Sequence, residues 1–126
     1  MKTFIVLEDE PLIAMDLQIA FEDAGQDCVC AIDNTEALAC IEEHDIAGAV
    51  LDVTLGGGQT CEKTAMKLSE LGIPFILHTG DLDRAGEHLR RFDVPIIAKP
   101  RPSDSVAKAI IEIVDTAEAE GQNQEA

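Results

Sequence analysis

Short apolar runs alternate with longer segments of helical periodicity along almost the whole chain. The apolar runs are four or five residues long and lie at residues 3–7, 28–32, 49–52, 74–78 and 95–98. After each run, apolar residues recur at the three- and four-residue spacing of helices, at residues 12–24, 36–43, 60–71, 83–92 and 103–117. Strand and helix therefore alternate five times, which predicts an α/β fold with a parallel sheet covered by helices on both faces.

Residues that start and stop helices stand at the predicted boundaries. Pro11 suits the first turn of the first helix, and Gly25 suits its C-terminal end. The sequence Asp33-Asn34-Thr35 offers N-cap side chains for the second helix, and Ser103 offers one for the last. Because crossovers between parallel strands are right-handed, few topologies remain for such a chain.

The chain reads as a single unit, without an internal repeat or a linker. We expect one domain over residues 1–126, with no output domain attached. The residues from about Glu118 onward are acidic and polar, and we expect them to form a frayed, flexible tail.

Composition narrows the classes of partner. The net charge is −16, from 25 acidic and 9 basic residues, which argues against nucleic acids and anionic membranes as partners. No apolar run approaches the roughly 20 residues of a membrane span. None of the four cysteines forms a C-x-x-C pair, so we expect reduced, packing cysteines in a cytoplasmic protein.

Polar side chains follow four of the five predicted strands at the point where each strand ends. They are Glu8, Asp9 and Glu10 after the first, Asp52 at the end of the third, Thr79 after the fourth and Lys99 after the fifth. Each alone has an ordinary explanation, as a helix cap, a turn residue or a solvated charge. Because ligands bind at the carboxyl ends of parallel strands, the combination predicts one cluster of carboxylates, a hydroxyl and an ammonium.

This combination of groups suits phosphoryl chemistry. Grouped carboxylates repel one another, and a divalent cation such as Mg²⁺, which takes oxygen ligands, removes that cost. Asp52 can then act as a nucleophile toward phosphorus, while Lys99 and Thr79 stabilise the phosphoryl oxygens. Three glycines at residues 56–58 leave room for the metal and the incoming donor.

Four stretches carry a resemblance to the receiver domains of two-component response regulators. They are VLEDEP at 6–11, AVLDVTL at 49–55, ILHTG at 76–80 and IAKP at 97–100. Together, the stretches place nearly the whole chain, from Thr3 to about Ala117, within the resemblance. It implies a flavodoxin-like, three-layer α/β/α fold with strand order 2-1-3-4-5 and five helices.

The resemblance also implies a role for each matching residue. Asp52 would accept a phosphoryl group from a phosphohistidine, with Thr79 as the switch hydroxyl and Lys99 as the phosphate contact. Mg²⁺ would be held by the acidic pair Glu8 and Asp9, with Asp9 as a direct ligand, by Asp52, and by the backbone carbonyl of Thr54. The Lys99–Pro100 peptide bond would be cis.

The chain departs from the family pattern at three places. Ile96 stands where the family often has an aromatic switch residue, and Arg101 stands where an apolar or aromatic residue usually follows Pro100. His78 precedes the switch hydroxyl, in a stretch, PFILHTG, that resembles a subgroup of stand-alone receivers with a remodelled switch surface.

The resemblance implies a stand-alone receiver rather than an enzyme, with self-phosphorylation and self-dephosphorylation at most. Its partners would be a histidine kinase or a histidine phosphotransfer protein, and a downstream protein target. Phosphorylation would switch protein contacts, or the domain would act as a phosphate sink, as a monomer or weak dimer.

Three alternatives stay open. The first is a phosphohydrolase or phosphotransferase with Asp52 as nucleophile, although Thr54 stands where dehalogenase-type enzymes place a second aspartate and the chain has no cap domain. The second is a flavodoxin-like cofactor binder, against which the acidic first loop, EDEP, argues. The third is a receiver that binds partners without phosphorylation, which the intact set of site residues disfavours.

Overall fold

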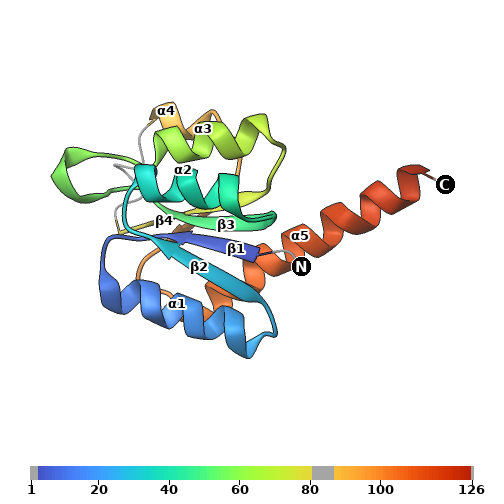
Figure 1. Ribbon diagram of the computed structural model, residues 1–126, viewed down its shortest axis with the longest axis horizontal. Helices are drawn as coiled ribbons and strands as arrows, with labels where there is room; N and C mark the ends of the chain where they lie inside the picture. The colour runs from blue at the N-terminus through green and yellow to red at the C-terminus, as the bar shows by residue number, and fades with distance from the viewer. Residues whose placement is uncertain (1–2, 81–86, 126) are drawn as a thin grey trace.

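A computed structural model describes residues 3–80 and 87–125 as a parallel sheet between two layers of helices (Figure 1). Five strands pair in the order β2-β1-β3-β4-β5, which confirms the predicted fold class. The strands are β1 (Thr3–Leu7), β2 (Asp27–Ala31), β3 (Ile46–Asp52), β4 (Phe75–Thr79) and β5 (Ile96–Ala98). The helices are α1 (Pro11–Asp23), α2 (Asn34–Glu43), α3 (Glu62–Glu70), α4 (Glu87–Arg90) and α5 (Ser103–Glu125), with a short 3-10 helix η1 (Gly56–Gly58).

Each face of the sheet carries its own hydrophobic core. Successive strand residues point to opposite faces, so in β1 Ile5 and Leu7 join one core while Phe4 and Val6 join the other. Helices α2, α3 and α4 cover the first core, and α1 and α5 cover the second (Figure 1). Strand β3 lies at the centre and is buried along its whole length, which explains its apolar sequence.

The predicted start of β3 is wrong by three residues. The sequence places it at Ala49, whereas the strand begins at Ile46 and includes Gly48. Gly48 interrupts the apolar run because α5 packs closely there: a Cβ atom on it would lie 2.9 Å from Val114 Cγ2. Most other ends of strands and helices differ from the prediction by one or two residues, as helix ends commonly do.

Both of the last two predicted helices are present among the described residues. For the helix predicted at 83–92, residues 83–86 lie outside the described residues, and α4 occupies Glu87–Arg90. The segment from Glu118, predicted to form a frayed and flexible tail, has helical backbone up to Glu125, where α5 ends, and it projects beyond the sheet (Figure 1). Glutamate, alanine and glutamine favour helix, and no proline interrupts the segment. Among the described helices, none combines the length and the hydrophobicity needed to cross a bilayer.

Candidate functional site

Parallel pairing brings the ends of four strands to one edge of the sheet. Glu8 follows β1 directly, Asp52 ends β3, Thr79 ends β4 and Lys99 follows β5. The register pairs Asp52 with His78 and Thr79 with Ala98, so these residues lie at the same level. They surround a cleft of about 400 Å³, lined by Asp9, Glu10, Asp52, Thr54, Leu55, Thr79, Gly80 and Lys99. Five of the six predicted site residues therefore line one cleft, and the sixth, Glu8, is bonded to Lys99.

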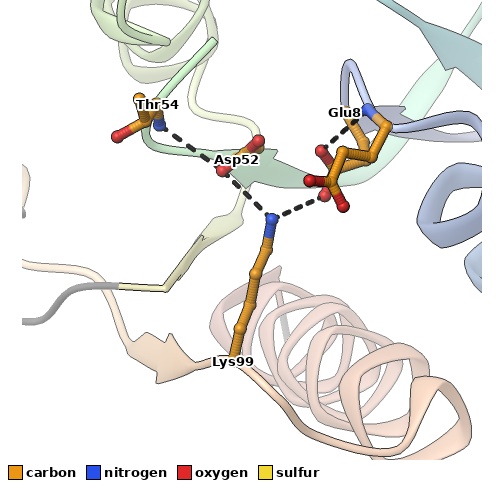
Figure 2. A network of polar contacts seen from close by, with 5 residues as sticks. Glu8, Asp52, Thr54 and Lys99 are labelled. Carbon is orange, nitrogen blue, oxygen red and sulfur yellow. Dashed lines mark hydrogen bonds and ion pairs between the residues drawn. The ribbon is translucent and has the colours of Figure 1, made fainter.

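Lys99 holds the centre of the site. Its side chain extends from the end of β5, and its ammonium group lies between two carboxylates (Figure 2). Lys99 Nζ is 2.8 Å from Glu8 Oε1 and 3.3 Å from Asp52 Oδ1. The cis Lys99–Pro100 peptide bond implied by the family resemblance is present.

Backbone amides donate further hydrogen bonds to the carboxylates of the site. The Glu10 N–H donates to Glu8 Oε2 at 3.2 Å, so both oxygens of Glu8 have a partner. The Thr54 N–H donates to Asp52 Oδ1 at 3.4 Å (Figure 2). Asp9 is half-buried at the rim, which leaves its carboxylate accessible from the cleft.

Three carboxylates converge closely enough to share a cation. One oxygen each from Glu8, Asp9 and Asp52 lies within 4.8 Å of the others. Mg²⁺ is bound by oxygen ligands at about 2.1 Å, usually through one or two carboxylates with waters, so direct coordination needs only two of the three carboxylates. A set made only of carboxylate oxygens in an open cleft suits such a hard cation, so the residues present fit a magnesium site.

Burial and crowding shift the pKa values of the central groups in different directions. Burial, together with the hydrogen bond to Glu8 and the charge of Glu8, raises the pKa of Asp52 well above its usual range. Burial also disfavours ionised Glu8, but hydrogen bonds with Asp52, Lys99 and the Glu10 amide lower its pKa overall. Burial would lower the pKa of Lys99, but the bond to Glu8 and the charges of both carboxylates raise it.

Thr79, His78 and Ile96 lie at the paired ends of β4 and β5. Thr79 is buried at the end of β4. Ile96, where the family often has an aromatic residue, is half-buried and packs against the core under α2 and α3. His78 is 4% exposed, and neither ring nitrogen has a hydrogen-bond partner among the described residues. Burial and the nearby Lys99 charge lower its pKa, which favours a neutral imidazole.

One polar residue near the site is missed by the sequence reasoning. The sequence suggests Asn34 only as a possible helix cap, whereas Asp33 caps α2 by accepting from the Glu36 N–H at 2.9 Å. Asn34 is buried, and its side chain bonds to Thr60 and Thr64 near the start of α3. Its spacing from Ala37 and Ile41 was the available signal, since these positions share the buried face of α2.

Solved structures with this fold include a closely similar protein. SdrG from Sphingomonas melonis Fr1 is 37% identical, over 86% of this chain and 92% of that chain, with a TM-score of 0.73. A CheY-like response regulator receiver domain protein from Methanospirillum hungatei JF-1 is 22% identical, over 95% and 98% of the two chains, with a TM-score of 0.83. No family model matches the chain, and no curated protein does.

The chain belongs to the response regulator receiver domains. SdrG has also been solved in a BeF3-activated conformation, under the organism name Pseudomonas melonis Fr1, which matches this chain at 37% identity and a TM-score of 0.71. That match covers 89% of this receiver domain and 95% of the SdrG chain. Membership in this family supports a role as a response regulator in signal transduction.

Proposed function

We propose that this receiver domain accepts a phosphoryl group on Asp52 from a phosphohistidine of a histidine kinase or a phosphotransfer protein, with Mg²⁺ bound. The observation that carries the proposal is the position of Asp52. Its carboxylate ends a buried central strand, 3.3 Å from Lys99 Nζ, in a cleft that Thr79 also lines. A carboxylate in such surroundings is a nucleophile presented to the cleft, with donors beside it for the oxygens of an incoming phosphoryl group.

The transfer would be a displacement at phosphorus. A carboxylate oxygen of Asp52 forms the new P–O bond as the P–N bond to the donor imidazole breaks, and the imidazole leaves with the electron pair of that bond. Lys99 can turn from Asp52 toward a phosphoryl oxygen and keep its contact with Glu8. The Thr79 hydroxyl, which also lines the cleft, would supply a second donor.

Bound Mg²⁺ would supply positive charge for the phosphoryl oxygens and would neutralise the carboxylates. Asp9 and Asp52 would be its direct carboxylate ligands, and the Thr54 backbone carbonyl would be a third. Glu8 would lie near the ion without coordinating it directly, because both of its oxygens already have partners. The raised pKa of Asp52 is consistent with this assignment, since a carboxyl held near other carboxylates ionises more readily once a cation is present.

The downstream effect would be a change in protein contacts, or the removal of phosphoryl groups from a shared kinase. The net charge of −16 favours a protein partner with a basic surface over nucleic acid. The BeF3-activated conformation of SdrG supports the view that a protein of this kind has a distinct activated state.

The test is phosphorylation by a small phosphodonor, followed by intact-mass spectrometry. The protein is incubated with acetyl phosphate, with Mg²⁺ or with EDTA. We expect one phosphoryl group per chain with Mg²⁺ and none with EDTA. An unmodified mass with Mg²⁺, under conditions that label a control receiver, would contradict the proposal.

A further inference from the structure

A buried, uncharged polar pair lies beside the phosphorylation site, between α2 and α3. Asn34 is 7% exposed and Thr64 is fully buried. Asn34 Oδ1 accepts from the Thr64 hydroxyl at 2.7 Å and from the Thr64 N–H at 3.3 Å. Asn34 Nδ2 donates to the Thr60 carbonyl at 2.9 Å. One side chain therefore connects the start of α2, the start of α3 and the segment that precedes α3.

That segment is the β3–α3 loop, residues 53–61, which leaves the sheet directly after Asp52 (Figure 1). The loop is a narrow hairpin: Thr54 pairs with Thr60, and the Leu55 N–H donates to the Gln59 carbonyl at 2.8 Å. At its base, the Cys61 N–H donates to the Val53 carbonyl at 3.3 Å. Because Thr60 lies opposite Thr54, a bond that fixes Thr60 also fixes Thr54, whose N–H reaches Asp52.

The tip of the loop contributes few contacts that would fix the position of the loop. Its three glycines are exposed, and Gly57 and Gly58 have φ values of 71° and 75°. Apart from the adjoining residues of the chain, no atom lies within 4 Å of where a Cβ of either residue would be. The position of Thr54 therefore depends on the base of the loop, where Leu55 packs into the core and Asn34 holds Thr60.

An apolar pair would fill the same space with less polar burial. Asn34, Ala37 and Ile41 follow the spacing of the buried face of α2, where an apolar residue is the ordinary choice. A buried polar residue adds little net stability over an apolar one, but its directional bonds fix one geometry. The Asn34–Thr64 pair is therefore better explained by a role in positioning the β3–α3 loop than by a contribution to stability.

We infer that Asn34 is a positioning residue for the magnesium site, which acts by holding Thr60 and, through the hairpin, Thr54. This inference rests on the proposed function, because it assigns to Thr54 the backbone ligand of Mg²⁺. Loss of the Asn34 bond releases the loop and weakens Mg²⁺ binding without unfolding the domain.

The test is the double variant Asn34→Leu/Thr64→Val, which replaces both partners by apolar side chains of similar shape. Removing both ends of the Asn34–Thr64 side-chain hydrogen bond is nearly neutral for stability, although the Thr60 carbonyl and the Thr64 N–H also lose Asn34 as a partner. The matched control is Asp33→Ala, which removes the cap of α2 but leaves the Asn34–Thr60 bond in place. If the double variant does not fold, Asn34→Ala removes the same bond to Thr60, at the cost of leaving the buried Thr64 hydroxyl without Asn34 as its acceptor.

Two readouts are measured: the Mg²⁺ dissociation constant by calorimetry, and hydrogen exchange over residues 54–60 in the metal-free protein. In the double variant we expect Mg²⁺ affinity to fall by about threefold to tenfold, at or below the roughly 10–100-fold typical of lost outer-shell partners of metal ligands. We also expect faster exchange at the Leu55 amide. In Asp33→Ala we expect lower stability but unchanged affinity and exchange.

Each outcome has a separate meaning. Unchanged affinity and exchange in the double variant would overturn the role of Asn34 and leave the proposed function intact. A wild-type protein that does not bind Mg²⁺ would overturn the proposed function and, with it, this inference.

Discussion

Two clusters of buried polar side chains, a charged group and a neutral group, lie at the same edge of this receiver domain. They differ in whether every side chain finds a matching charge or hydrogen-bond partner within its group. In the charged group, one ammonium, Lys99, faces the two carboxylates of Glu8 and Asp52. In the neutral group, Asn34 uses both its nitrogen and its oxygen, and the Thr64 hydroxyl has a partner. The charged group has one positive charge too few, which is expected of a site that takes a cation, whereas the neutral group is complete and holds structure.

The largest effect should follow from removing the central carboxylate of the charged group. Asp52→Asn keeps the shape of the side chain but removes the nucleophile, so we expect complete loss of phosphoryl labelling by intact mass. Labelling that persists in this variant would contradict the role of Asp52 as acceptor. The circular dichroism spectrum of the variant checks that it is folded and should match that of the wild-type protein.

The same variant should be more stable than wild type in metal-free buffer. The folded-state pKa of Asp52 lies above the unfolded value, so the folded state binds more protons and its stability falls as pH rises toward the raised pKa. An uncharged amide side chain carries no such penalty, and each unit of pKa shift corresponds to about 1.4 kcal/mol. We expect a gain of about 1–3 kcal/mol at pH 8 that shrinks toward pH 4, measured by urea denaturation with EDTA. A gain that is independent of pH would contradict the assigned cause.

Removing the Lys99 ammonium should lower the stability of the domain, which is the opposite of the effect expected for Asp52→Asn. Lys99→Ala leaves Glu8, which is 1% exposed, without its charged partner, and we expect a loss of roughly 2–4 kcal/mol at pH 7. The folded-state pKa of Glu8 is lowered, so its contribution is present above the unfolded pKa and is lost as pH falls through the folded pKa. The loss should therefore be smaller in acid.

A matched control for Lys99→Ala is Lys67→Ala. Lys67 pairs with Glu70 at 4.0 Å on the surface, with 42% of its side chain exposed, and we expect a loss below about 0.5 kcal/mol. Equal losses in the two variants would show that Lys99 is an ordinary surface charge. Mg²⁺ binding should survive in Lys99→Ala, because Lys99 contributes no ligand to the ion.

The charged group should also make Mg²⁺ affinity depend on pH. The raised pKa of Asp52 means that the cation displaces a proton when it binds near neutral pH. We expect affinity to rise by up to about tenfold per pH unit between pH 6 and pH 7, measured by calorimetry at constant ionic strength. A pH-independent affinity would indicate that Asp52 is already ionised in the metal-free protein.

Among the residues of the two groups, the smallest effect should come from the neutral group. Thr64→Val removes one hydroxyl and leaves the Asn34–Thr60 bond, so we expect a loss of about 1 kcal/mol by urea denaturation. Phosphoryl labelling should be unchanged. A loss of labelling in this variant would show that the neutral group takes part in the chemistry directly.

The difference between the two groups also explains what the sequence could predict. The charged residues were found because they follow strands, and parallel strands end at one edge whatever the details of packing. The pairing of Lys99 with Glu8 was not predicted, because it depends on how a long side chain crosses from β5 to β1. Asn34 was missed because its role depends on Thr60 and Thr64, which are distant in sequence and reach it only when α3 packs against α2.

The fold, too, was predicted where it depends on local sequence and not where it depends on contacts between distant residues. The strands and helices were predicted because apolar periodicity is a local property. The early start of β3 was not, because Gly48 is explained only by the close approach of Val114 from α5. The helical backbone beyond Ala117 was not predicted because polarity alone suggests fraying, although most of its residues are good helix formers.

The central claim is that Asp52 itself is the phosphoryl acceptor, and the most direct measurement locates the phosphoryl group. The protein is phosphorylated with acetyl phosphate and Mg²⁺ and then reduced with borohydride, which converts an aspartyl phosphate to homoserine. Peptide mass spectrometry identifies the converted position. The account predicts homoserine at position 52 alone; conversion at another aspartate, with Asp52 unmodified, would contradict it.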